Sequence, residues 1–236
     1  MSEIFNCKSD GNMQSNTTSI GGIVGNSSRT QIEYCINEAT VESSLYHIGG
    51  IVGNSAHSNL KKCVNLGEIK GGTSGSSLSG IIGQAWDSAV EECYNIGKIS
   101  GQSHVAGIVG NLEETTIKNC YNQGDITANF TSGGIVGQAL EGSVTNCYNS
   151  GNSLYGIIGI VRDTVKGMIK IDNCYYLNTN ISKGENIIEG YEEFVSGSSI
   201  GKTIDDMTNS EFVELLNNKS NVWKQEQNSL PILSWQ

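Results

Sequence analysis

Residues 107–126 read GIVGNLEETTIKNCYNQGDI, and this stretch contains the three signals that decide the fold. A Gly-Ile-Val-Gly run comes first, an isolated apolar residue, Ile117, follows it, and a Cys-x-Asn-x-Gly-x-Ile run closes the stretch. Each apolar segment is too short for a helix and is rich in β-branched residues, which favours short strands. The polar residues between the segments are typical of turns.

The same signals recur along the chain at a nearly constant interval. Successive cysteines are 28, 28, 30, 27, 27 and 27 residues apart, at Cys7, Cys35, Cys63, Cys93, Cys120, Cys147 and Cys174. Gly-Ile-Val-Gly or Gly-Ile-Ile-Gly runs occupy residues 22–25, 50–53, 80–83, 107–110, 134–137 and 156–159. Their glycines are expected to serve tight corners and close approach of strands. A fixed period of this size indicates a solenoid, a propeller or another repeat array.

Three short strands in each period predict a parallel β-helix, because a propeller blade needs a longer repeat and a leucine-rich repeat needs regularly spaced Leu. We therefore expect an all-β, right-handed parallel β-helix (solenoid) of about 6–7 coils over residues 1–178. Residues 179–236 are expected to form a small C-terminal α/β cap over the open end of the last coil. Thr208-Asn209-Ser210-Glu211 should supply the N-cap of a short amphipathic helix through Phe212 and Leu216, which Asn217-Asn218 would end.

Alternation along a strand places Cys120, Asn122 and Ile126 on one inward face, provided that the chain turns a corner near Asn119. A buried free cysteine acts as a small apolar residue, and we expect all seven thiols to be reduced and buried. Stacked amides both donate and accept hydrogen bonds. The predicted structural ladders comprise Cys35, Cys63, Cys93, Cys120, Cys147 and Cys174, and Asn37, Asn65, Asn95, Asn122 and Asn149. Parallel thiols suit neither a disulfide nor a zinc site.

A tyrosine follows four of these cysteines and should point to the opposite face of the strand. Tyr94, Tyr121, Tyr148 and Tyr175 are therefore predicted to form an aromatic ladder. Two interpretations stay open for it. An inward ladder would be packing, whereas an outward ladder would be a platform for sugar rings or a partner surface.

The charge balance narrows the classes of partner. With 24 acidic and 14 basic residues the formal net charge is −10, which argues against binding to nucleic acid. No apolar run is long enough for a membrane span. Charged residues make up only 16% of the chain, so Ser, Thr, Asn and Gly must keep it soluble, as in many secreted proteins.

The Gly-Ile-Val-Gly runs joined to Cys-Tyr-Asn-x-Gly-x-Ile resemble the GLUG-motif repeats of large bacterial secreted and surface proteins. The resemblance covers about residues 4–178. It implies an extracellular repeat region with a β-helix fold, and it implies no catalytic residues. The residues of the C-terminal region, from Met207 to Trp235, are similar to the segment that often follows such repeats.

We accordingly expect a non-catalytic repeat scaffold, adhesin-like or serving surface display, without catalytic residues, cofactor or metal. The chain begins in mid-repeat, so preceding repeats or domains of a longer chain are expected partners, together with surface glycans or proteins. A carbohydrate-binding module and a carbohydrate-active lyase or hydrolase are the alternatives. The enzyme finds little support, because His47, His57 and His104 lie in variable segments without a repeated Ser or Asp partner.

Overall fold

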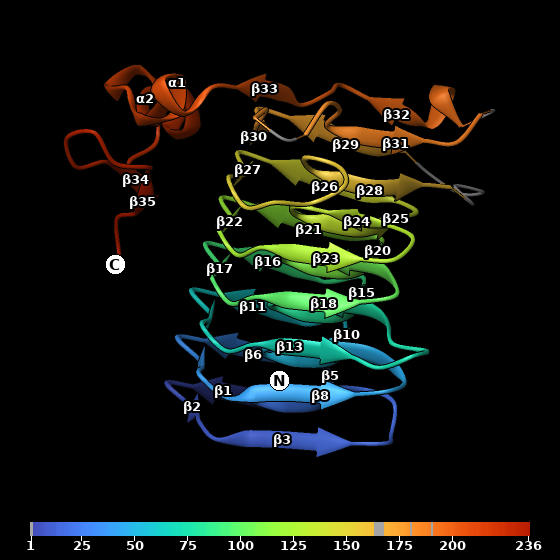
Figure 1. The fold of residues 1–236 in the computed structure, drawn as a ribbon. Coiled ribbons are helices and arrows are strands. Elements are labelled where there is room, and N and C mark those ends of the chain that lie inside the picture. Colours follow the sequence, from blue (N-terminus) through green and yellow to red (C-terminus); the bar gives the residue numbers. More distant parts are fainter. Residues whose placement is uncertain (1, 163–167, 180, 190) are drawn as a thin grey trace.

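The computed structural model describes residues 2–162, 168–179, 181–189 and 191–236. Within these residues the chain winds into a stack of coils, and the strands of each coil pair in parallel with those of the next. Figure 1 shows the first coil at one end of an elongated solenoid and the strands that follow residue 185 at the other. The expected all-β parallel β-helix is confirmed.

Five sheets, here called A to E in the order in which a coil passes through them, run along the solenoid. Sheet A comprises β1 (Ser2–Phe5), β6 (Thr30–Glu33), β11 (Asn59–Lys61), β16 (Ala89–Glu91), β21 (Thr115–Lys118), β26 (Gly142–Thr145), β29 (Ile169–Asp172) and β32 (Val195–Ser196). Sheet B comprises β2 (Lys8–Ser9), β7 (Ile36–Asn37), β12 (Val64–Asn65), β17 (Tyr94–Asn95), β22 (Tyr121–Asn122), β27 (Tyr148–Asn149), β30 (Tyr175–Leu177) and β33 (Ile200–Lys202).

The other three sheets close the coil. Sheet C comprises β3 (Asn12–Ser15), β8 (Thr40–Ser43), β13 (Ile69–Gly71), β18 (Ile99–Gly101) and β23 (Ile126–Ala128). Sheet D comprises β4 (Ile20–Gly21), β9 (Tyr46–Gly49), β14 (Ser76–Ser79), β19 (Ser103–Ala106) and β24 (Ser132–Gly133). Sheet E comprises β5 (Val24–Ser28), β10 (Val52–Ala56), β15 (Ile82–Trp86), β20 (Val109–Glu113), β25 (Val136–Ala139), β28 (Ile158–Val161) and β31 (Glu185–Ile187).

A complete coil thus holds five short strands, whereas the sequence predicts three. The Cys-x-Asn-x-Gly-x-Ile run contributes two of them, because the chain bends at Gly124 between β22 and β23. The strands of sheet D are the fifth set. They present few inward apolar side chains, such as Leu78 and Val105, and so give too weak a pattern to be recognised in the sequence.

Residues other than glycine make the corners, in the left-handed region of backbone conformation. The corner between sheets A and B is formed by Tyr34, Lys62, Glu92, Asn119, Asn146 and Asn173, with φ between 52° and 55°. Equivalent left-handed positions precede sheet A (Arg29, His57, Asp87 and Glu114) and lie at sheet D (Ser19, His47, Ser77 and His104). The corner expected near Asn119 is confirmed. The chain also bends at the Gly-Ile-Val-Gly runs, for example at Gly50-Ile51 between β9 and β10, but without positive φ: the described glycines with positive φ are Gly11, Gly142 and Gly197.

The repeated glycines also allow the backbones of neighbouring coils to approach closely, which is the second role predicted for them. A Cβ atom on Gly50 would lie 2.2 Å from the carbonyl oxygen of Gly80 and 2.4 Å from Oδ1 of Asn65. One on Gly97 would lie 2.0 Å from the carbonyl oxygen of Gly67. No side-chain carbon fits at these distances, so glycine is required where the backbone passes the asparagine ladder.

Ladders of apolar residues and cysteines fill the main core between sheets A, B and E. The six thiols from Cys35 to Cys174 are at most 1% exposed, as predicted, and all seven cysteines are free. Cys7 is the exception, because it is exposed. It lies in the first coil, and within the described residues no further coil stacks on the outer side of that coil. Water exclusion raises the pKa of the Cys120 and Cys174 thiols, which therefore stay protonated.

The asparagine ladder runs through the solenoid beside the thiols. Nδ2 of Asn95 donates to Oδ1 of Asn122 at 2.7 Å and to the carbonyl oxygen of Gly97 at 2.9 Å. The same amide-to-amide bond, at 2.7 Å in every case, joins Asn37 to Asn65, Asn65 to Asn95, and Asn122 to Asn149. These five side chains are fully buried. The ladder ends where Tyr176 takes the next position.

Strand pairing continues past the boundary expected between residues 178 and 179. Strands β31, β32 and β33 pair with β28, β29 and β30, so the coils extend to Lys202. The elements outside the ladders are η1 (Glu192–Phe194), α1 (Ile204–Thr208), α2 (Ser210–Asn217) and the antiparallel pair β34 (Trp223–Lys224) and β35 (Ile232–Leu233). Helix α2 begins as predicted, since Oδ1 of Asn209 accepts a hydrogen bond from the backbone N–H of Glu211.

The C-terminal segment, residues 203–236, lies mainly along the side of the solenoid, next to sheet B (Figure 1). The sequence instead predicts a cap across the open end. The physical reason is the apolar area on sheet B: Tyr121 and Tyr148 pack against Phe212 and Trp223, and all four side chains are buried. Outward phenol rings on several coils offer more surface to bury than the cross-section of one coil.

We predict that Asn95→Ala lowers the free energy of unfolding by about 2–4 kcal/mol, because it removes three buried hydrogen bonds and leaves two neighbouring amides partly unpaired. Urea denaturation measures the change. Asn26→Ala, which alters an exposed asparagine of sheet E, should stay within about 0.5 kcal/mol of the unmodified chain. Equal effects of the two substitutions would show that the ladder contributes no stability.

We also predict that a thiol reagent modifies one cysteine rapidly in the native protein and all seven after denaturation without reductant. Cys7 should be the reactive residue, because the others are excluded from water. Colourimetric titration before and after adding denaturant measures both numbers. Two or more disulfides, or several reactive thiols in the native state, would contradict the buried ladder.

Candidate functional site

The tyrosine ladder predicted as a candidate ligand surface points outward from sheet B but is covered. The rings of Tyr94 and Tyr121 are parallel with centroids 4.8 Å apart, and those of Tyr121 and Tyr148 are parallel at 5.1 Å. Tyr175 lies edge-on to Phe212 at 5.2 Å. The ladder therefore forms as predicted, and the C-terminal segment occupies the face that a sugar ring would need.

Hydrogen bonds fix the C-terminal segment to these tyrosines. The hydroxyl group of Tyr148 donates to the carbonyl oxygen of Pro231 at 2.5 Å, and that of Tyr121 lies 3.2 Å from Oε1 of Gln236. Trp223 packs against both rings, with centroids 5.6 Å from Tyr148 and 5.9 Å from Tyr121. Burial away from water raises the pKa of Tyr121 and Tyr148 well above the ordinary phenol value. Packing is thus the interpretation that the structure supports.

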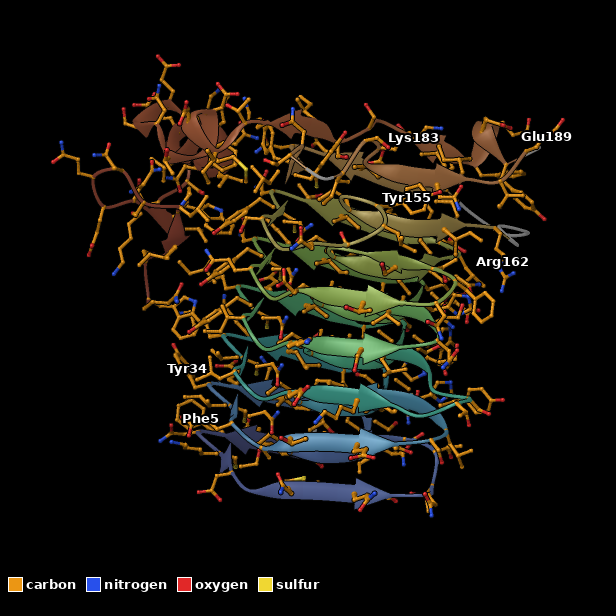
Figure 2. All side chains as sticks on the ribbon, viewed as in Figure 1. Phe5, Tyr34, Tyr155, Arg162, Lys183 and Glu189 are labelled. Carbon is orange, nitrogen blue, oxygen red and sulfur yellow. The ribbon has the colours of Figure 1, made fainter. Side chains whose placement is uncertain are left out.

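The aromatic column continues toward the first coil. Trp235 lies 6.0 Å from Tyr94 and 6.2 Å from Tyr34, and Tyr34 lies edge-on to Phe5 at 5.3 Å. Figure 2 shows Phe5 and Tyr34 one above the other on the side of the solenoid that the C-terminal segment follows. Phe5 is 64% exposed at the end of this column.

The predicted cysteine and asparagine ladders form, and they lie inside the solenoid. Each asparagine is hydrogen-bonded to an asparagine of a neighbouring coil and donates to a backbone carbonyl oxygen, so none reaches a surface where a ligand could bind. Among the residues that the structure describes, no three His, Cys, Asp or Glu side chains are grouped as a metal site would need. No helix among them is long and apolar enough to cross a membrane.

Two of the histidines have charged partners, and these partners are not repeated from coil to coil. Nδ1 of His57 lies 2.7 Å from Oδ2 of Asp87 in the next coil, so this histidine does have an acidic partner. Nε2 of His104 lies 3.5 Å from a guanidinium nitrogen of Arg162, and burial together with that charge lowers the pKa of His104 to about 4. Sequence spacing could not show the His57–Asp87 pair, since a 30-residue interval occurs at only one step of the repeat.

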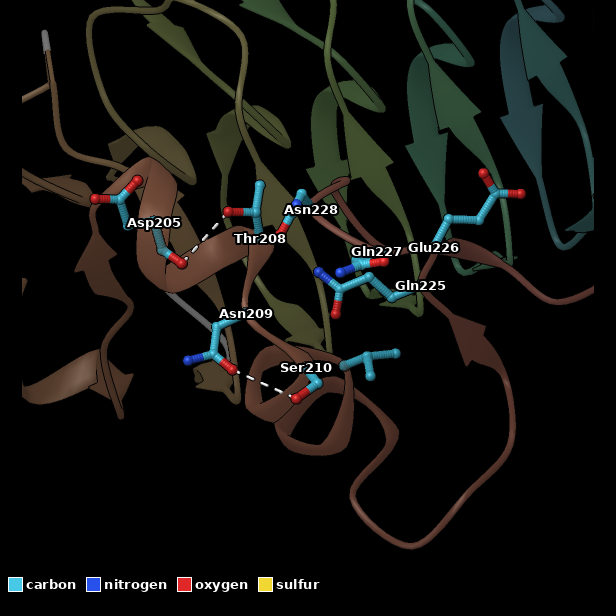
Figure 3. Close-up of a pocket in the computed structure, with 9 residues that line it drawn as sticks. Asp205, Thr208, Asn209, Ser210, Gln225, Glu226, Gln227 and Asn228 are labelled. Atoms are coloured by element: carbon cyan, nitrogen blue, oxygen red, sulfur yellow. Dashed lines mark hydrogen bonds between the residues drawn. The ribbon is translucent and has the colours of Figure 1, made fainter.

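One hollow lies in the C-terminal segment and has a volume of about 530 Å³. Figure 3 shows its lining from helices α1 and α2 and from the loop after β34, including Asp205, Asn209 and Gln225. Its polar groups mainly cap the short helices: Thr208 donates to the carbonyl oxygen of Asp205, and Ser210 to Oδ1 of Asn209. These contacts support local folding rather than a binding site.

A second hollow, of about 380 Å³, lies on the outer surface of sheet E. Asn54, Ala56, Gln84, Trp86, Glu113 and Glu114 line it. Trp86 is 39% exposed, and its indole is held by the edge of the His57 ring at a centroid distance of 4.4 Å. The sequence analysis missed these residues. The available signal was a single Trp at a position where the neighbouring repeats carry Ala56 and Glu113.

We predict that Trp223→Ala uncovers the tyrosine ladder. The substitution should lower the free energy of unfolding by about 3–5 kcal/mol and let the pKa of Tyr121 and Tyr148 fall toward 10.0. In the unmodified chain these phenols stay protonated above pH 10, where an unfolded chain ionises, so stability should fall as pH rises past 10. Ultraviolet titration of tyrosinate and urea denaturation measure the two effects. Trp86→Ala is the matched control and should change neither.

The comparisons with known proteins agree with this architecture. The family model described as "The GLUG motif" matches residues 101–127 and 128–154, which are two successive repeats. A solved structure from Bacteroides ovatus, described as a candidate immunoglobulin A1 protease, has a similar fold, with a TM-score of 0.60 and 21% sequence identity over 99% of this chain and 75% of that one. A search of curated proteins gives no match. Residues 101–154 therefore carry two GLUG motifs, and the chain that contains them has a parallel β-solenoid fold.

Proposed function

We propose that this chain is a non-catalytic repeat scaffold, an adhesin-like or surface-display region of an extracellular or cell-surface bacterial protein. The observation that carries the proposal is the asparagine ladder. The asparagine that recurs in every central repeat forms coil-to-coil hydrogen bonds of 2.7 Å, and the thiols from Cys35 to Cys174 and the rings of Tyr121, Tyr148 and Tyr175 are likewise buried. The side chains that the motif repeats therefore hold the coils together as a rod.

The outer face of sheet A supports the same proposal. Glu33, Lys61, Glu91 and Lys118 occupy one register position in successive coils, so that charges of opposite sign alternate along the rod. Nζ of Lys61 lies 3.6 Å from a carboxylate oxygen of Glu91. Exposed ion pairs contribute little stability. A one-coil shift in stacking would nevertheless bring like charges together, so this column favours the correct register.

The extracellular location rests on two properties of the chain. A surface of Ser, Thr, Asn and Gly with only 16% charged residues keeps the protein soluble through neutral polar groups. The six buried thiols take no part in disulfides and are excluded from water, which makes them inert and compatible with an oxidising compartment. A rod of this kind can hold other domains away from a cell surface.

We further propose that preceding repeats stack on the first coil. Strands β1 to β5 pair with the second coil through one edge, and Oδ1 of Asn37 accepts a hydrogen bond from Ser9. Cys7 is exposed in this coil, although the equivalent cysteines of the later coils are buried. Another coil would pair the free edges of these strands and cover Cys7.

The test is an added coil. Replacing Met1 by a copy of residues 30–57, with the copied cysteine changed to serine, places the new coil in register with Ser2, since Ser2 pairs with Thr30 in the structure. We predict that the native reaction of Cys7 with a thiol reagent slows at least tenfold and that the thermal midpoint rises. An extension of the same composition in scrambled order is the control. Unchanged reactivity of Cys7 would refute stacking of repeats on this end.

The related solved structure adds one arm to this test. That protein is described as an immunoglobulin A1 protease candidate. If this chain is a non-catalytic scaffold, it should leave immunoglobulin A1 intact after prolonged incubation. Gel analysis of the heavy chain measures the outcome. Specific cleavage, abolished by substituting residues of this chain, would overturn the scaffold proposal while leaving the fold unaffected.

A further inference from the structure

We propose that the hollow around Trp86 binds a neutral, hydroxyl-rich saccharide, with one pyranose ring stacked on the indole. The proposal goes beyond the scaffold function and does not depend on it. It rests on the one tryptophan of the chain that the C-terminal segment does not use: Trp223 and Trp235 pack on the tyrosine ladder, whereas Trp86 is exposed on sheet E.

The indole is presented as a firm, open platform. The backbone N–H of His57 donates to the carbonyl oxygen of Trp86, the ring of His57 meets the indole edge-on, and Asp87 holds the imidazole at 2.7 Å. The register neighbour of Trp86 in the preceding coil is Ala56, whose methyl group leaves space beside the indole. A sugar ring presents an apolar C–H face that can fill this space, and an aromatic surface gains from covering it.

Polar groups surround the platform in the arrangement that hydroxyl groups need. Asn54 and Gln84 lie at one register position in successive coils, two residues before Ala56 and Trp86, and Glu113 follows Trp86 in the next coil. An amide both donates and accepts, as a hydroxyl group does, and a carboxylate accepts from hydroxyl groups. An apolar wall with a few convergent polar groups is the usual composition of a small-molecule site.

The negative charge around the hollow favours neutral saccharides over acidic ones. Glu113 and Glu114 line it and Asp87 lies beside Trp86, so acidic sugars would meet three carboxylates. A cationic peptide would gain from these charges, but a single aromatic wall cannot enclose an ammonium group and the two amides would add nothing specific to it. A neutral saccharide uses every group that lines the hollow.

The amides continue along the rod beyond the hollow. Asn26, Asn54, Gln84, Asn111 and Gln138 occupy one register column, and Nδ2 of Asn54 donates to Oδ1 of Asn26 at 3.3 Å. Coils stack about 4.8 Å apart, which is close to the length of one sugar unit in an extended chain. A linear polysaccharide that stacks one ring on Trp86 would thus place neighbouring rings beside further amides.

Affinity gel electrophoresis of the full chain tests the proposal. The probes are neutral glucan, mannan, xylan and galactan, with polygalacturonate and polylysine as charged comparators. We predict that at least one neutral polysaccharide retards the chain, that the charged polymers do not act through Trp86, and that Trp86→Ala weakens retardation roughly tenfold. Gln84→Ala, which leaves the indole in place, should weaken it severalfold. Glu113→Gln should retain it, because an amide still accepts from a hydroxyl group.

Phe130→Ala is the matched control, since it removes an exposed aromatic ring outside the hollow and should leave retardation unchanged. Circular dichroism should give equal thermal midpoints for all variants, because Trp86 and Phe130 are exposed. Absence of retardation by every neutral polysaccharide would overturn the proposal, as would equal retardation of Trp86→Ala. Retardation by polylysine that depends on Trp86 and is lost in Glu113→Gln would assign the hollow to a cationic partner instead.

Discussion

The stacking of one coil directly on the next is the constraint on which the rest of this structure depends. Every strand of sheets A to E pairs in parallel at a fixed separation, so each residue of these strands lies above its counterpart one period away. The asparagine ladder makes the constraint specific. A buried amide must find a donor and an acceptor, and the only identical group within reach is the asparagine of the neighbouring coil.

The glycines follow from the same constraint. Gly50 has to be glycine because the carbonyl oxygen of Gly80 and the amide of Asn65 lie where a Cβ atom would stand. Insertions are tolerated away from this position. The 30-residue interval between Cys63 and Cys93 keeps the pairing of Asn65 with Asn95, because the additional residues lie between sheets C and D, around Gly72–Gly75. The inner face is therefore uniform, and the outer face is free to differ from coil to coil.

Differences between coils on the outer face explain where binding can occur. Sheet B carries tyrosines in four coils, and this uniform apolar strip is covered by the C-terminal segment of the same chain. Sheet A carries alternating charges that match each other along the rod. Sheet E carries a column of amides, and two residues further along the strands a neighbouring column holds Trp86 between Ala56 and Glu113. The face that departs from the repeat is the one that offers a distinct surface to a ligand.

The sequence by itself determined the period, the β-solenoid, and the inward direction of Cys120, Asn122 and Ile126, because a residue that recurs at every turn must stack on itself in a parallel coil. It also determined that a helix starts within Thr208-Asn209-Ser210-Glu211, where the structure has Asn209 as the N-cap of α2. Tertiary structure alone decided three features. The strands of sheet D carry too few apolar residues to be seen, the coils extend to Lys202 without a recognisable motif, and the C-terminal segment lies on sheet B. Pairs such as His57 with Asp87, and the hollow beside Trp86, join residues of different coils. Such residues become neighbours because their coils stack on one another. Where a position does not recur in the repeat, the order of residues along the chain does not reveal this contact.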